Sequence, residues 1–165
     1  MTNLKLLSLI LFTLVISTNA NLIEQTCTQT PNHDLCVHYL KADPHSSDAD
    51  VTGLALIMVN VIKTKANTSL NKIHQLLEGN PKPGQKEALN SCSGRYNAIL
   101  VADVPQAIAA LKKGDPKFAV DSANDAAIEA TSCEKSFSGK SPLTNDNNSM
   151  NDIAAVTAAI VKILL

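Results

Sequence analysis

The chain has 165 residues, with 14 Lys and Arg against 15 Asp and Glu, so its formal net charge is −1. This balance gives no reason to expect a nucleic-acid partner, and a hydrophobic content of 45% excludes an intrinsically disordered chain. Aromatic residues make up only 3%, which disfavours β-sandwiches and barrels, so length and composition together predict a single all-α domain.

The first twenty residues have the features of a secretory signal peptide. Lys5 supplies a positive charge, an apolar run follows from Leu6 to Ile16, and Thr18-Asn19-Ala20 resembles a cleavage site. The run is shorter than the roughly 20 residues that a transmembrane helix requires. We therefore expect residues 1–20 to be removed, leaving a secreted domain over residues 21–165 with no membrane anchor.

The oxidising secretory pathway makes the four cysteines candidates for two disulfides. In an antiparallel helical hairpin, a bridged pair should be centred on the turn between the two helices. The midpoint of the first two cysteines falls on Pro31-Asn32, and the midpoint of the last two falls close to the helix-breaking Gly114-Asp115-Pro116. We therefore expect the pairs Cys27–Cys36 and Cys92–Cys133, and the second should stabilise the fold by about 4 kcal/mol.

A zinc site is the alternative for the first cysteine pair. His33, Cys36 and His38 lie close together in the sequence, and imidazole and thiolate groups are zinc ligands. Zinc sites usually combine two such clusters, however, and the sequence has no second Cys/His cluster. We therefore expect no metal and no cofactor.

Residues 21–47 predict a helical hairpin that precedes the main body of the domain. Two short helices are expected over 22–29 and 32–41, with a hinge at Thr30-Pro31. Residues 43–47 should form a loop that leads to acidic N-cap candidates for the next helix.

Residues 48–165 are expected to form four long helices in an up-down-up-down bundle. Apolar residues recur every three or four positions over 51–78, which predicts the first of these helices, and the Gly- and Pro-rich sequence 79–84 ends it. The second helix spans roughly 85–113. Pro105 should kink or interrupt it, because proline lacks the backbone N–H of a regular helix.

The third long helix begins at Pro116 and extends to about Phe137, and it carries apolar residues that include Phe118 and Ile128. A stretch rich in Ser, Gly and Asn, residues 138–149, then leads to the fourth helix. The buried stripe of that last helix is expected to consist of Ile153, Val156, Ile160 and Ile163.

Catalytic motifs are missing from the sequence. It has no nucleophile elbow, no phosphate-binding Gly loop, no His-Glu-x-x-His sequence and no dinucleotide fingerprint. The carboxylates are expected on solvated helix faces, so the sequence predicts a protein that is not an enzyme. Two sequons make Asn67 and Asn147 possible N-glycosylation sites, provided that each is exposed.

The turn between the second and third long helices contains four residues with an expected role in the fold and one, Lys117, without such a role. Gly114 should end one helix and Asp115 should cap the next. Pro116 suits the first helical position, and Phe118 would return to the core. Lys117 is unexplained, because the helix dipole disfavours a positive charge in the first turn. A cation at a tight turn, braced by the second disulfide, is suited to bind an acidic pocket.

Several segments resemble one known family, the plant invertase and pectin methylesterase inhibitors. The N-terminal hairpin with its cysteine spacing and the turn sequence Pro116-Lys117-Phe118 carry most of the resemblance, which covers nearly the whole mature chain. Further matching segments are Leu54–Val59, Asn90–Cys92, Cys133–Glu134 and Ala159–Leu165. The resemblance is strongest to the cell-wall invertase inhibitors, which the Pro-Lys-Phe sequence separates from the pectin methylesterase inhibitors.

The resemblance implies a four-helix bundle with an N-terminal hairpin and the disulfide pairing expected above. It also implies a 1:1 complex with acid invertase (beta-fructofuranosidase), in which the turn enters the sucrose-binding cleft. Lys117 would meet acidic residues of the enzyme and Phe118 would pack nearby, while Asp115 and Pro116 would hold the turn rigid. The implied location is the apoplast or cell wall, with the vacuole as the alternative.

Three other functions remain open at this point. Inhibition of pectin methylesterase would use the same fold, and the sequence Pro116-Lys117-Phe118 argues against it. A secreted carrier of small apolar ligands would use a cavity within the bundle. A hydrolase is the third, and the missing nucleophile constellation argues against it.

Overall fold

All regular structure in the described part of the chain is helical, in agreement with the prediction from composition. The computed structural model describes residues 22–138 and 140–165. The predicted signal peptide, residues 1–20, therefore lies outside the described residues. Of the described helices, none combines the length and the apolar composition needed to span a bilayer.

The N-terminal hairpin consists of a helical segment over residues 22–27 and helix α2 (His33–Ala42). Asn32 begins α2, because its side-chain oxygen accepts a hydrogen bond from the Leu35 N–H at 3.1 Å. The Cys27–Cys36 disulfide joins the two segments, and both cysteines are fully buried. The expected helices were 22–29 and 32–41, so only their ends differ from the observed ones.

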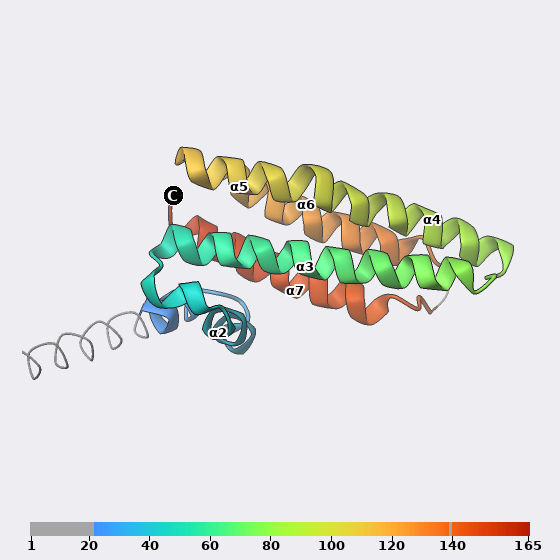
Figure 1. The fold of residues 1–165 in the computed structure, drawn as a ribbon, viewed down its shortest axis with the longest axis horizontal. Helices are drawn as coiled ribbons and strands as arrows, with labels where there is room; N and C mark the ends of the chain where they lie inside the picture. The colour runs from blue at the N-terminus through green and yellow to red at the C-terminus, as the bar shows by residue number, and fades with distance from the viewer. Residues whose placement is uncertain (1–21, 139) are drawn as a thin grey trace, which may run out of the picture.

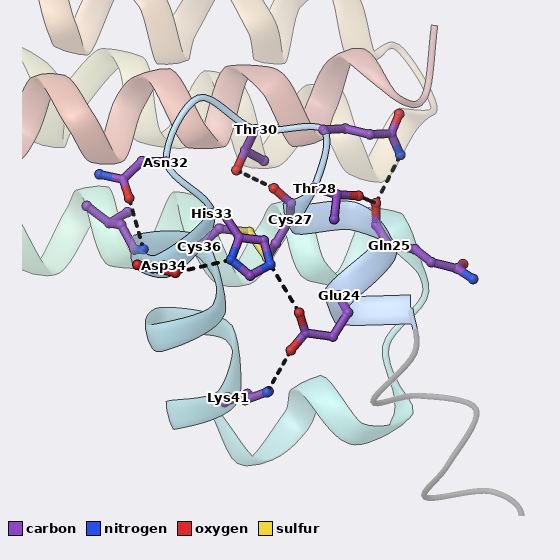
Figure 2. The surroundings of a disulfide bond; sticks show 12 residues. Glu24, Gln25, Cys27, Thr28, Thr30, Asn32, His33, Asp34, Cys36 and Lys41 are labelled. Carbon is purple, nitrogen blue, oxygen red and sulfur yellow. Dashed lines mark hydrogen bonds and ion pairs between the residues drawn. A yellow bond between two sulfur atoms is a disulfide. The ribbon is translucent and has the colours of Figure 1, made fainter.

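A chain of ionic contacts also joins the two arms of the hairpin, as Figure 2 shows. Glu24 accepts a hydrogen bond from Lys41 Nζ at 2.8 Å, and its second oxygen lies 3.1 Å from His33 Nε2. The Asp34 carboxylate, 3.2 Å from His33 Nδ1, and then Glu24 raise the pKa of His33. Because His33 faces carboxylates and Cys36 is part of a disulfide, the segment considered for zinc does not present the ligands that zinc needs.

The connection to the bundle is more regular than expected. Residues 43–47, predicted as a loop, contribute to the short 3₁₀ helix η1 (Pro44–Asp48). Helix α3 (Val51–Glu78) follows, and its N-cap is Asp50, whose carboxylate accepts a hydrogen bond from the Gly53 N–H at 2.8 Å. Observed and predicted bounds of this helix agree.

The second rod of the bundle is interrupted where Pro105 predicts an interruption. It consists of α4 (Pro83–Ala98), the π-helical segment η2 (Ile99–Asp103) and α5 (Val104–Lys113). A proline ring in a regular α-helix would clash with the carbonyl four residues earlier and leave that carbonyl without a donor. The wider π-helical turn directly before Pro105 relieves this conflict without bending the chain out of the bundle.

Helices α6 (Pro116–Lys135) and α7 (Thr144–Lys162) complete an up-down-up-down bundle (Figure 1). The hairpin packs against α3 and α7 at one end of it. Helix α7 begins inside residues 138–149, which were expected to be a linker. On α6, Phe118 and Ile128 are 51% and 57% exposed. Their apolar side chains predict a place in the core, but neither residue belongs to it.

Polar side chains tie the helices together where α6 passes into α7. The Tyr96 hydroxyl donates to Asn147 Oδ1 at 2.8 Å, and Asn147 Nδ2 donates to Glu134 at 2.6 Å. Burial, with the Asp146 and Glu134 charges, raises the pKa of Tyr96 to about 12. The Thr144 hydroxyl donates to the other Glu134 oxygen at 2.6 Å. This network (Tyr96, Glu134, Thr144 and Asn147) therefore fixes the packing of α4, α6 and α7 at one end of the bundle.

Candidate functional site

The turn between α5 and α6 lies at one tip of the bundle, at the same end as the chain's C-terminus (Figure 1). The connections from α3 to α4 and from α6 to α7 lie at the opposite end. The turn is thus set apart from the polar network and is free to meet another surface.

Backbone hydrogen bonds alone determine the conformation of this turn. Gly114 has φ 74° and ψ 31°, the left-handed conformation that favours glycine. The Gly114 N–H donates to Leu111 O at 3.2 Å, and the Asp115 N–H donates to Ala110 O at 3.0 Å. These two bonds form a Schellman motif, which satisfies carbonyls that the end of α5 would otherwise leave unpaired.

Two of the predicted site residues, Asp115 and Pro116, lie at the start of α6. Pro116 occupies the first position of α6, as predicted. Asp115 occupies the N-cap position of α6, as predicted, but its side chain makes no capping hydrogen bond. The Schellman motif draws the Asp115 backbone toward α5 instead, and its carboxylate remains at the surface.

Lys117 and Phe118 both point their side chains away from the core. Lys117 is exposed and takes part in none of the ion pairs formed within residues 22–138 and 140–165. Phe118 is 51% exposed, so the purely structural explanation, in which it returns to the core, is wrong. The buried residues beneath the turn are Ala110, Leu111, Ala119 and Val120. The turn thus presents an exposed cation next to an exposed aromatic ring, and buried apolar residues pack beneath it.

The tip carries more positive charge than the sequence motif alone suggests. Lys112 and Lys113, in the last turn of α5, are exposed beside Lys117. The negative end of the α5 dipole favours the first two lysines, whereas the positive end of the α6 dipole disfavours Lys117. Three ammonium groups at one tip can bind a carboxylate-lined surface.

The second disulfide is present but does not brace this turn. Cys92 and Cys133 are bonded, as the turn midpoints predict, and they join α4 to the far end of α6. Seventeen residues of helix separate Pro116 from Cys133, which corresponds to about 25 Å at 1.5 Å per residue. The prediction that this disulfide braces the turn is therefore wrong. The conformation of the turn depends on Gly114 and the Schellman motif instead.

The structure separates the two candidate glycosylation sites. Asn67 is exposed on α3, so it stays a candidate. Asn147 is 1% exposed, and the amide nitrogen that would carry the glycan donates to Glu134. A glycan at Asn147 would break the polar network and find no space, so this candidate is wrong for the folded protein.

Sequence reasoning did not detect the buried carboxylate next to Asn147, that of Asp146, or its two lysine partners. Asp146 lies 3.0 Å from Lys65 Nζ and 2.6 Å from Lys72 Nζ, and it joins α7 to α3. Burial acts to raise the pKa of Asp146, but hydrogen bonds from Lys72 and Lys65 hold it below the ordinary value. Lys65 and Lys72 are seven residues apart on α3, so they share one face of the helix. This spacing is the signal in the sequence that could have pointed to these ion pairs.

Two further features bear on the possible chemistry of the chain. Within the part that the structure describes, no group of three or more His, Cys, Asp or Glu side chains is placed to hold a metal ion. An open groove of about 560 Å³ runs between the end of α2 with the start of η1 on one side and α3 on the other, and Tyr39, Pro44, Ile57 and Val61 contribute its apolar surface. This groove is distant in sequence from the turn.

Comparisons with known proteins agree with the helical fold. The family model described as plant invertase/pectin methylesterase inhibitor matches residues 21–160. An Arabidopsis thaliana protein named cell wall / vacuolar inhibitor of fructosidase 1 is 49% identical over 140 residues, covering 85% of this chain and 67% of its own length. A putative invertase inhibitor from Platanus orientalis is 32% identical and covers 95% of this chain and 96% of itself.

A solved structure extends the comparison to the fold. The crystal structure of a mutant form of a pectin methylesterase inhibitor from Arabidopsis superposes with a TM-score of 0.72 at 21% identity. The match covers 84% of this chain and 94% of the other, so the helical bundle and hairpin are shared over almost the whole domain. The family is one of inhibitor proteins rather than enzymes, and this chain belongs to the plant invertase/pectin methylesterase inhibitor family.

Proposed function

We propose that this protein inhibits acid invertase in a 1:1 complex by inserting the Pro116-Lys117-Phe118 turn into the sucrose-binding cleft. The observation that carries the proposal is the tip itself: an exposed cation and an exposed aromatic ring on a turn fixed by its backbone. A cleft that cleaves glycosidic bonds with paired carboxylates offers the complementary negative charge.

The rigidity of the turn favours tight binding. A loop that already has its bound conformation loses little conformational entropy when the complex forms. Gly114 and the Schellman motif supply this preorganisation, so Lys117 and Phe118 need to order only their own side chains. The name of the Arabidopsis thaliana relative supports a fructosidase as the target and the cell wall as the place of action, with the vacuole as the alternative.

A titration against two enzymes tests the proposal. Purified protein is added to acid invertase and, separately, to pectin methylesterase near pH 5, and the residual activity of each is measured. We expect invertase activity to fall to a stoichiometric end point at one inhibitor per enzyme. Inhibition of the esterase alone would replace the proposed target with pectin methylesterase, which the family also includes.

A matched pair of lysine variants tests the contact. Lys117→Ala should weaken inhibition by roughly 2–5 kcal/mol, because the enzyme's carboxylates would be left buried and unpaired. Lys86→Ala is the control, since Lys86 is also exposed but lies on α4 at the opposite end of the bundle. Equal potency of the two variants, with unchanged thermal unfolding, would contradict the assignment of the turn.

A further inference from the structure

The two sequon asparagines differ in the freedom of the amide nitrogen that would carry a glycan. Asn67 is exposed on α3, and its amide nitrogen donates to the Lys63 carbonyl at 3.0 Å. A glycan replaces one of the two protons on this nitrogen, so the bond to Lys63 can remain. At Asn147 the same nitrogen is buried and donates to Glu134. Of the two sequons, the folded chain therefore has room for a glycan only at Asn67.

The third residue of the first sequon shows when this glycan has to be added. A sequon is recognised through its asparagine together with the Ser or Thr two residues later. Here that residue is Ser69, whose side chain is fully buried once α3 has packed. Transfer to Asn67 must therefore precede packing, while the chain enters the secretory pathway. A chain modified at Asn147 at that stage should fail to fold, because it loses the polar network.

The Asn67 side chain is directed along α3 toward the open groove between the end of α2 and α3. Side chains of an α-helix tilt toward its N-terminus, and the contact with Lys63 places the amide nitrogen one turn before Asn67. Thr64, next to Lys63, lines the groove, and so does Asn60. Asn60, Thr64 and Asn67 follow one another at spacings of four and three residues, so they lie along one helix face. A glycan on Asn67 thus begins at the edge of the groove.

The groove has the size and the surface of a site for a sugar. Its volume of about 560 Å³ lies within the range of roughly 300–1,000 Å³ that is usual for small-molecule sites. The Tyr39 ring and the aliphatic side chains of Ile57 and Val61 provide apolar surface. Polar side chains that line it are Asn60, Thr64 and Thr68. A sugar ring can pack its apolar face on the first group and direct its hydroxyls toward the second.

The charges of the groove favour an uncharged occupant. Its two charged lining residues, Lys65 and Asp43, already have partners. Lys65 pairs with Asp146 at 3.0 Å, and the Asp43 carboxylate accepts a hydrogen bond from the His45 N–H at 2.8 Å. N-acetylglucosamine, the first sugar of an N-glycan, is neutral and therefore matches this surface better than an anion does.

We propose that Asn67 carries the N-glycan of the secreted protein and that the first sugars of this glycan lie in the groove between α2 and α3. In the transfer, the Asn67 amide nitrogen forms a bond to C1 of the first sugar of a lipid-linked oligosaccharide. The bond from C1 to the lipid diphosphate breaks, the diphosphate leaves with the electron pair, and the amide nitrogen loses one proton. The proposal depends on secretion and not on the identity of the target enzyme.

Mass spectrometry of the protein secreted by plant cells tests the modification. We expect the mass of the wild type to exceed that of the unmodified chain by one glycan, and Asn67→Gln to lose this excess completely. Asn71→Gln is the matched control, since Asn71 is exposed one turn further along α3 and is not part of a sequon. An unmodified wild-type chain, or a glycan on Asn147 of the folded protein, would overturn the proposal.

Deglycosylation tests the place of the glycan. Removing it with a peptide N-glycosidase, which leaves Asp at position 67 in every variant, should lower the melting temperature of the wild type by about 2–4 °C, because apolar surface of the groove becomes exposed. Val61→Lys puts a charge into the groove and should abolish this shift, and Tyr39→Ser should do the same without altering α3. Gln75→Lys, exposed on α3 outside the groove, should keep it. Equal shifts in all four proteins would show that the glycan projects into solvent.

Discussion

The α5–α6 turn and the opposite end of the bundle are held in shape by different kinds of contact. At the tied end, where α6 passes into α7, the Cys92–Cys133 disulfide and the network of Tyr96, Glu134, Thr144 and Asn147 link three helices. The turn end is here the α5–α6 turn itself, where backbone hydrogen bonds and one left-handed glycine determine the conformation and the side chains of Lys117 and Phe118 face solvent.

This difference shows how a small helical protein can expose the side chains that bind a partner without losing its fold. Side chains that stabilise the fold are engaged with one another and cannot bind a partner. By placing these contacts at the tied end, the protein leaves Lys117 and Phe118 free at the other end. The comparison predicts that stability and inhibition can be changed separately.

The largest expected effect comes from removing the disulfide at the tied end. The double variant Cys92→Ala/Cys133→Ala should lower the free energy of unfolding by about 4 kcal/mol, because the bond closes a long loop in the unfolded chain. Denaturant titration measures this loss. Inhibition by the fraction that remains folded should be unchanged, since about 25 Å of helix separates the bond from the turn. A parallel loss of potency would show that the two ends are coupled.

Asn147 gives the next largest effect. Asn147→Ala leaves the Tyr96 hydroxyl and Glu134 Oε2 without their partner, although Thr144 still donates to Glu134 Oε1, and this loss should cost about 2–3 kcal/mol. Asn148→Ala is the matched control, since the neighbouring asparagine is exposed. Thermal unfolding of the two variants measures the difference, and equal melting temperatures would contradict the role of the network.

The sequence predicts the fold well because the fold depends on local signals. Apolar periodicity places α3, the breakers place the turns, and the turn midpoints predict both disulfides. Long-range polar contacts have no such local signal. Asn147 belongs to a stretch of Ser, Gly and Asn that is typical of a linker, and its contacts with Tyr96 and Glu134 explain its burial.

The candidate site was predictable in its position but not in its details. Gly114 and Pro116 predict the turn, because their conformational preferences are local. The exposure of Phe118 was not predictable, since an aromatic residue one turn into a helix is compatible with core or surface. The role of Asp115 depends on the Schellman motif, in which its backbone N–H reaches Ala110 rather than its side chain reaching α6.

A moderate effect is expected at the turn end. Gly114→Ala introduces a side chain at φ 74°, where the new Cβ would meet no heavy atom within 4 Å apart from the adjoining backbone. Its cost is therefore conformational, about 1–2 kcal/mol. We expect a lower melting temperature together with a higher inhibition constant, because the turn relaxes away from its bound conformation. Gly114→Asn should recover part of both, since asparagine tolerates this conformation better.

The smallest effect involves Asp103, which lies in η2 between the two ends. One of its carboxylate oxygens is buried and has no hydrogen-bond partner among the described residues. Burial, together with the charges of Asp125 and Glu129 on α6, raises the pKa of Asp103 to about 6. No ion pair among the described residues involves Asp103, and Arg95 is paired with Glu129 at 3.0 Å.

This raised pKa makes the fold more stable in mild acid. Below about pH 4 Asp103 is protonated in both the folded and the unfolded chain, because an unperturbed Asp has a pKa of about 3.9. As the pH rises to about 6, the unfolded chain loses the proton first, so the free energy of unfolding falls; above this range the penalty is constant. Partial exposure of Asp103 keeps the effect to about 1 kcal/mol or less.

Unfolding experiments at several pH values test the assignment to Asp103. Asp103→Asn should flatten the decline between about pH 4 and 6, since it removes the titrating group and retains its shape. His33, whose pKa is raised in the hairpin, contributes stability that is lost at higher pH, above about 6.5, so its titration does not mask the effect. An unchanged decline in Asp103→Asn would assign the pH dependence to other carboxylates. A flattened decline with unchanged inhibition would place Asp103, like the tied end, among the residues that support the fold without contacting the target.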